Sequence, residues 1–157
     1  MDTSRWHEIR EFLAGEVVRQ LLPHLGEDFE VLAPPTRAFN CVAHALGRQD
    51  EWINPVTGPP EDPFREMDRR YGEHGFTRLP TLDLALVPGV QKVAVYALRN
   101  AGGGVEEITH AALQEADGTW SSKLGQGPLI RHGTVEALAG PAYGEPVTVY
   151  VRPSPTP

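Results

Sequence analysis

The sequence lacks the features that would point to disulfides, membranes or secretion. A single cysteine, Cys41, occurs among the 157 residues, so no disulfide can form within the chain. A lone thiol is typical of reducing compartments, and we therefore expect a cytoplasmic location. No apolar run approaches the roughly 18 residues that a membrane span requires. The polar stretch over residues 1–8 does not have the apolar segment of a secretory signal, so we expect none.

Positive charge is also scarce. The chain holds 14 Lys and Arg against 21 Asp and Glu, which gives a net charge of −7. Nucleic acids and anionic membranes attract proteins mainly through an excess of Lys and Arg. The composition therefore predicts a partner that is neither a nucleic acid nor a membrane.

Glycine and proline, in contrast, are plentiful. The chain has 16 Gly and 15 Pro, which predicts many turns and short elements rather than a helical bundle. The hydrophobic fraction of 40 % is too high for a disordered chain. We expect one domain over residues 1–152, because the length suits a single core. Residues 153–157 are so rich in proline that we expect a disordered tail.

Apolar spacing predicts helices in the first half of the chain. Trp6, Ile9, Leu13, Val17 and Leu21 recur every three or four residues and predict one buried helical stripe. The expected elements are helices over residues 5–22, 39–47 and 62–72, a short strand over 29–32 and a long proline-rich loop over 48–63.

The second half alternates between apolar and polar residues, which predicts strands. We expect strands over residues 92–98, 109–115, 119–124 and 146–151, and a helical turn over 134–139. Asp117-Gly118 is a strong hairpin signal between two of them. Helices followed by an antiparallel meander indicate an α+β domain.

Cys41 is the first candidate for chemistry, because it stands where a loop enters a predicted helix. The partial positive charge of a helix start favours the thiolate, which is the nucleophilic form of cysteine. The alternative is a small buried apolar residue, a common role of free cysteine.

His110 is the candidate base. It lies in the apolar strand before the predicted hairpin, and a histidine facing the start of a cysteine-bearing helix is the arrangement of thiol hydrolases. The alternative is a half-buried strand histidine whose nitrogens bond to the backbone.

The residue that would orient His110 depends on strand register. A two-residue turn at Asp117-Gly118 would place Ser121 and Lys123 on the face of His110, whereas a loop one residue longer or shorter would place Ser122 there. None of these is the Asn, Asp or Glu that usually orients a catalytic histidine.

Asn40 and Trp120 are candidate substrate contacts. Asn40 could stabilise an oxyanion, although a helix N-cap is the alternative; Trp120 could equally be a core anchor. His44, three residues after Cys41, could form half of a metal site, but no further Cys or His completes four ligands. We therefore expect neither a metal nor a cofactor.

Several motifs resemble an uncharacterised bacterial domain family with the pattern N-C-x-A-x-A-x-G, T-H-A-A and G-x-W-x-S-K-L-G. The resemblance covers about residues 39–152 and leaves the first helix outside. The matching segments are residues 40–47, 92–96, 109–112, 118–125, 130–132 and 143–144. The order of motifs is similar to the NlpC-like and CHAP-like branch of the papain superfamily.

This resemblance implies a papain-like fold, with N-terminal helices packed on a small antiparallel sheet. It also implies Cys41 as nucleophile, His110 as base and a polar orienting residue on the next strand, where this chain has Ser122 and Lys123.

Two functions follow as expectations. The first is a cysteine hydrolase of the peptidase or amidase type, acting on a peptide or amide substrate. The second is a non-catalytic binding or accessory module with a papain-like shell and a protein partner, as in toxin–immunity or defence systems.

Overall fold

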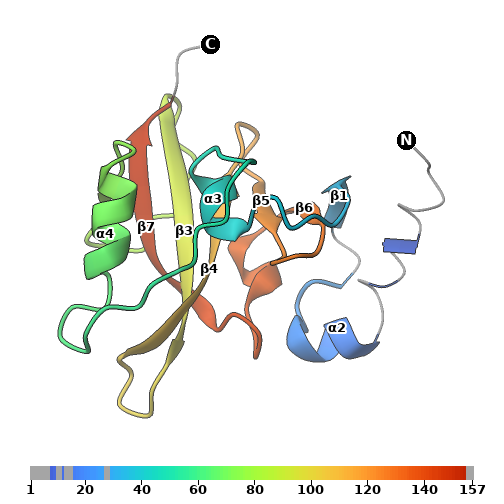
Figure 1. The fold of residues 1–157 in the computed structure, drawn as a ribbon, viewed down its shortest axis with the longest axis horizontal. Helices are drawn as coiled ribbons and strands as arrows, with labels where there is room; N and C mark the ends of the chain where they lie inside the picture. The colour runs from blue at the N-terminus through green and yellow to red at the C-terminus, as the bar shows by residue number, and fades with distance from the viewer. Residues whose placement is uncertain (1–7, 10–11, 13–15, 27–28, 155–157) are drawn as a thin grey trace.

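A seven-stranded antiparallel sheet forms the frame of the molecule (Figure 1). The computed structural model describes residues 8–9, 12, 16–26 and 29–154. The strands lie in the order β1-β6-β5-β4-β3-β7-β2. They are β1 (Phe29–Ala33), β2 (Thr77–Arg78), β3 (Val90–Arg99), β4 (Val105–Gln114), β5 (Trp120–Lys123), β6 (Leu129–His132) and β7 (Glu145–Pro153).

The expected meander is present as β3-β4-β5, in which each strand pairs with the next along the chain, and it continues into β6, which the sequence did not predict. β3 shows why its sequence forms a central strand, since residues 92–97 are all buried. Its side chains alternate, with Val93 and Val95 on one face and Ala94 and Tyr96 on the other. β1 joins the sheet beside β6, and β7 pairs with the free edge of β3.

The helices are short. Among the described residues they are α2 (Glu16–Leu21), α3 (Cys41–Ala45), α4 (Arg65–Gly72) and the 3-10 turn η1 (Val135–Leu138). α3 stops quickly because Gly47, with a φ of 82°, reverses the chain two residues after its end. α4 begins later than the sequence predicts. Its N-cap is Phe64 rather than Asp62, whose carboxylate pairs with Arg65 instead.

The prediction of papain-like helices packed on a small antiparallel sheet is wrong. The sheet is the larger part of the fold, and in the described ranges no helix exceeds eight residues. The difference arises because the predicted short strand joins the sheet as β1, and β2 and β6, which the sequence did not predict, join it as well. No helix in those ranges has the length and apolar character needed to cross a membrane.

The predicted N-terminal helix is seen only in part. Trp6 and Leu13 of its expected stripe lie outside the described residues, and Leu21 is 48 % exposed, so the stripe is wrong at that position. Val18 and Leu22, four residues apart, make the buried side instead.

The C-terminal end also differs from the expected tail. Pro153 belongs to β7, and the Ser154 N–H donates to the carbonyl of Gly89 at 2.9 Å. Residues 155–157 lie outside the described part of the chain.

Each face of the sheet carries its own core. On the first, here called the α3 face, Val93, Val95 and Ala111 pack against α3 and α4. On the second, the α2 face, Tyr96 and Ala112 pack with residues of α2 and η1. Figure 1 shows α3 lying across β4 and β5, so the start of α3 sits directly over the sheet.

Candidate functional site

Asn40 caps α3 and anchors it to the loop that follows. Its Oδ1 accepts hydrogen bonds from the backbone N–H of Ala43 (3.2 Å) and of Ile53 (3.1 Å). Its Nδ2 donates to the carbonyl of Ile53 at 2.6 Å. The side chain is 3 % exposed and its oxygen is already used twice. Asn40 is therefore an N-cap, and the arrangement offers no oxyanion contact from this residue.

Cys41, the first residue of α3, is buried against the α3 face. Burial raises the pKa of its thiol to about 11, and this outweighs the opposing effects of a backbone hydrogen bond at Ala111 and of the nearby Lys123 charge. A thiol with such a pKa is protonated at neutral pH. The expectation that the helix start would favour the thiolate is not met here, because desolvation dominates.

His110 does not face Cys41. It pairs with Tyr96 in the sheet, while its neighbour Ala111 pairs with Val95 and packs on the α3 face. Successive residues of a strand point to opposite faces, so His110 lies on the α2 face. Its ring stacks on Tyr143 with centroids 4.1 Å apart and meets the edge of Tyr96 at 5.2 Å. The predicted Cys41–His110 pair is therefore not formed.

A bulge in β4 explains where His110 goes. Tyr96 pairs with His110 and Ala97 with Ile108, so Thr109 is an extra residue in β4. Thr109 Oγ1 donates to the carbonyl of Tyr143 at 2.5 Å, which holds this segment over the histidine.

His110 is neutral and unsatisfied. Neither of its ring nitrogens has a hydrogen-bond partner among the described residues. Its pKa lies well below the usual range, because of burial first and the proximity of His132 and His44 second. The backbone-bonded alternative for His110 is thus not what the structure shows either.

The β4–β5 hairpin has the longer loop. Leu113 pairs with Ser121, and the Glu115 N–H donates to the Thr119 carbonyl at 2.7 Å, which leaves a three-residue loop over 116–118. This register places Ser122 on the face of His110, which was one of the two alternatives. Ser122 does not orient His110, however: its Oγ lies 2.8 Å from Nε2 of His132, whose Nδ1 lies 2.8 Å from the carbonyl of Thr134.

Lys123 points to the α3 face with Cys41, and it is fully buried. Its Nζ donates to the carbonyls of Thr36 (2.7 Å) and Gly125 (2.5 Å) and lies 5.1 Å from the centre of the Phe39 ring. Burial lowers its pKa to about 8. Lys123 therefore ties the segment before α3 to the end of β5, which is an interior strand and not a sheet edge.

Two of the remaining candidates are also structural. Trp120 is 4 % exposed and belongs to the core of the α2 face, so the core-anchor alternative holds. His44 Nε2 lies 2.8 Å from Ser121 Oγ, which in turn donates to Glu115 Oε1 at 2.5 Å. Burial, with Lys123 nearby, lowers the pKa of His44 to about 4. In the described ranges no group of three His, Cys, Asp or Glu is arranged to hold a metal ion.

A family model described as Domain of unknown function (DUF7689) matches residues 30–151. The chain belongs to this family. The match runs from the second residue of β1 into β7, so the DUF7689 unit includes the edge strand β1. No curated protein and no solved structure matches the chain.

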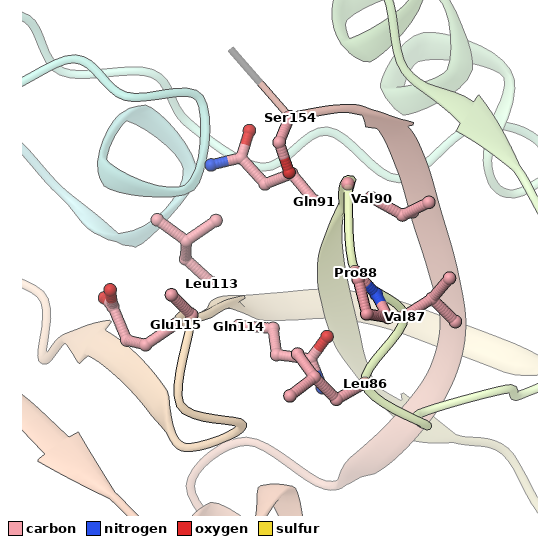
Figure 2. Close-up of a pocket in the computed structure, with 11 residues that line it drawn as sticks. Leu86, Val87, Pro88, Val90, Gln91, Leu113, Gln114, Glu115 and Ser154 are labelled. Carbon is pink, nitrogen blue, oxygen red and sulfur yellow. The ribbon is translucent and has the colours of Figure 1, made fainter. Parts of the chain in front are cut away.

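A cavity of about 420 Å³ in the DUF7689 domain was not foreseen from the sequence (Figure 2). It opens where β3 begins and β4 ends, and the segment before β3 forms one wall. Its lining residues are Leu86, Val87, Pro88, Gly89, Val90, Gln91, Leu113, Gln114, Glu115, Ala116 and Ser154. The one sequence signal for it was the apolar character of residues 82–88, between two predicted elements.

Proposed function

We propose that this DUF7689 domain is a non-catalytic binding module for a protein partner. The observation that carries the proposal is the placement of Cys41 and His110 on opposite faces of the sheet. A cysteine hydrolase needs its base within hydrogen-bond reach of the sulfur. This arrangement separates them by the sheet itself.

The other polar groups near Cys41 support the same proposal. His44 and Ser121 are bonded to each other, and Ser121 is fully buried, so neither presents a free group to a substrate. Lys123 is held by two carbonyls. Each of these side chains satisfies a neighbour in the interior, which is the usual role of buried polar residues.

The surface near the cavity is suited to binding. Leu82, Leu86 and Val87 are exposed by 45 %, 47 % and 40 % in one connecting segment. Clustered exposed apolar side chains mark interaction sites more often than isolated ones do. A partner that covered Leu86 and Val87 would also close the cavity that they line.

Alkylation of Cys41 by iodoacetamide tests the proposal. A thiol pKa of about 11 leaves about 100-fold less thiolate than an ordinary cysteine has at pH 7.5. We expect the native protein to react at least about 100-fold more slowly than glutathione. The His110→Phe variant, where it stays folded, should be alkylated at the same rate as the parent protein.

Two controls accompany that measurement. Protein unfolded in urea should react like glutathione, and Cys41→Ser should not be labelled. The proposal would be overturned if the native protein were labelled faster than glutathione at pH 6 and if His110→Phe or His44→Phe removed that enhancement. That result would support a cysteine hydrolase instead.

A further inference from the structure

The cavity lies where two neighbouring strands part. β3 and β4 pair from Val93 and Leu113 onwards, whereas Val90 and Gln91 pair only with β7. The resulting gap is covered by residues 86–89 and bordered by Ser154 (Figure 2). Its volume of about 420 Å³ is within the range of ligand sites.

Most of the lining is aliphatic. Figure 2 shows Leu86, Val87 and Val90 on one side of the space and Leu113 on the other. Such walls favour an unbranched hydrocarbon chain, at about 25 cal/mol for each Å² of apolar surface removed from water. An aliphatic side chain fits this part of the cavity.

Glu115 adds a negative charge to the aliphatic wall. It is the one charged residue among the described residues of the lining, and no ion pair involves it within the described part of the chain. Its Oε1 accepts the hydroxyl of Ser121, while its Oε2 has no hydrogen bond to any other described residue. Arg152 donates to Gln91 Oε1 but also to the carbonyl of His74, so that cation is already engaged.

Gln114, the last residue of β4, points to the opposite face of the sheet from Glu115. Its Nε2 donates to the carbonyl of Leu84 at 3.0 Å, and a carbonyl can only accept, so this nitrogen is correctly assigned. Its Oε1 is buried without a partner among the described residues. An unsatisfied buried acceptor costs about 1–3 kcal/mol. This acceptor lies on the side of Leu84, whereas Glu115 bonds to Ser121 beside His44 on the α3 face, so one ammonium does not reach both.

We propose that this cavity binds a lysine side chain of the protein partner. The inference rests on the proposed binding function and names what the site recognises. The aliphatic walls would hold the four-carbon stem, and Oε2 of Glu115 would accept a hydrogen bond from the ammonium. Lysine suits the site better than arginine, because a guanidinium prefers both carboxylate oxygens and Ser121 already occupies Oε1. The net charge of −7 also favours a cationic partner.

An NMR titration of the full chain tests this inference. The probes are the acetylated and amidated tripeptides Ala-Lys-Ala, Ala-norleucine-Ala and Ala-Arg-Ala, together with free butylamine. We expect the lysine peptide to shift the amide signals of residues 86–91 and 113–116. The norleucine peptide, which has the same stem without the charge, should bind at least fivefold more weakly.

Two variants distinguish the effect of the Glu115 charge from the effect of the net charge of the domain. Glu115→Gln keeps an acceptor for Ser121 and should abolish the preference for lysine over norleucine. Glu107→Gln, at an exposed position of β4, removes the same charge and should leave the preference unchanged.

Four results would overturn the inference. They are equal binding of the norleucine and lysine peptides, tighter binding of the arginine peptide, shifts with butylamine but none with peptides, and no localised shifts with any probe. None of them depends on the reactivity of Cys41, so the alkylation result judges the proposed function separately.

Discussion

At the scale of single residues, position in the sheet decides what each polar side chain does. Cys41 and His110 are the types of residue that a thiol hydrolase uses, but both are buried and neutral. Burial shifts each pKa towards the uncharged form, which lowers the reactivity of the thiol and makes the imidazole a weak base. The two residues that suggested a site in the sequence therefore both lie in the interior of the fold.

Acid should destabilise the protein through His44 and His110. The pKa of His44 is lowered to about 4 and that of His110 well below 6.5, so the folded state excludes a proton that the unfolded chain takes up below pH 6.5. The contribution of these two histidines to stability should therefore be constant well above pH 6.5 and fall as the pH drops from 6.5 towards 4. The loss should be about 1.4 kcal/mol for each pH unit and histidine.

Urea unfolding at pH 7.5 and 5.0 measures this loss. In His110→Phe the loss between the two values should be about 2 kcal/mol smaller than in the parent. His24→Phe, at an exposed histidine, is the matched control and should lose as much as the parent. Equal losses in all three proteins would contradict the assignment of neutral buried histidines.

At the scale of elements, the bulge in β4 and the segment after η1 act together. The extra residue Thr109 bonds to the carbonyl of Tyr143, whose ring covers His110. The chain after η1 reverses direction here, and an isolated antiparallel bridge joins Gly140 and Gly144. Gly144 is required there for two reasons: its φ is 75°, and a Cβ would stand 2.1 Å from the carbonyl oxygen of Ala97.

Gly144→Ala should therefore be severely destabilising. The left-handed conformation alone costs about 1–2 kcal/mol for alanine, and the clash with the backbone adds to it. We expect a total loss of at least about 3 kcal/mol in a urea unfolding experiment. Gly103→Ala, with a φ of 86° and no atom within 4 Å of its Cβ, separates the two causes and should lose only about 1–2 kcal/mol. Similar losses in the two variants would show that the close contact with Ala97 is unimportant.

At the scale of the whole molecule, one sheet separates two apolar cores. β3, β4 and the neighbouring strands contribute alternate residues to both, so neither core can come apart without the other. Ile108 on the α3 face and Ile130 on the α2 face are both at most 2 % exposed. They give equivalent probes of the two sides.

Ile108→Ala and Ile130→Ala should each cost about 2–5 kcal/mol. Because the cores share their strands, both variants should unfold in a single transition, with the same midpoint by far-ultraviolet circular dichroism and by tryptophan fluorescence. Trp120 lies in the core of the α2 face and reports on that side. Separate midpoints in either variant would show that the two faces unfold independently.

Much of the fold could be read from local sequence. The strand around residues 92–98 follows from alternation, and the hairpin that includes residues 119–124 follows from Asp117-Gly118, as the structure confirms. Asn40 as an N-cap follows from its position before a short helix. These features depend on neighbours within a few residues, where backbone propensity and periodicity decide the outcome.

The sequence by itself determined the composition, the strands β3, β4 and β5 and the residues that are chemically capable of reaction. Only the tertiary structure decided which of them meet. A single extra residue in β4 and a loop of three residues instead of two set the register, and with it the face on which His110 and Ser122 lie. The joining of β1 and β2 to the sheet, the burial of Cys41 and the cavity beside Glu115 all depend on contacts between distant segments. Local patterns carry no information about these contacts, because the free energy of such packing depends on the whole fold.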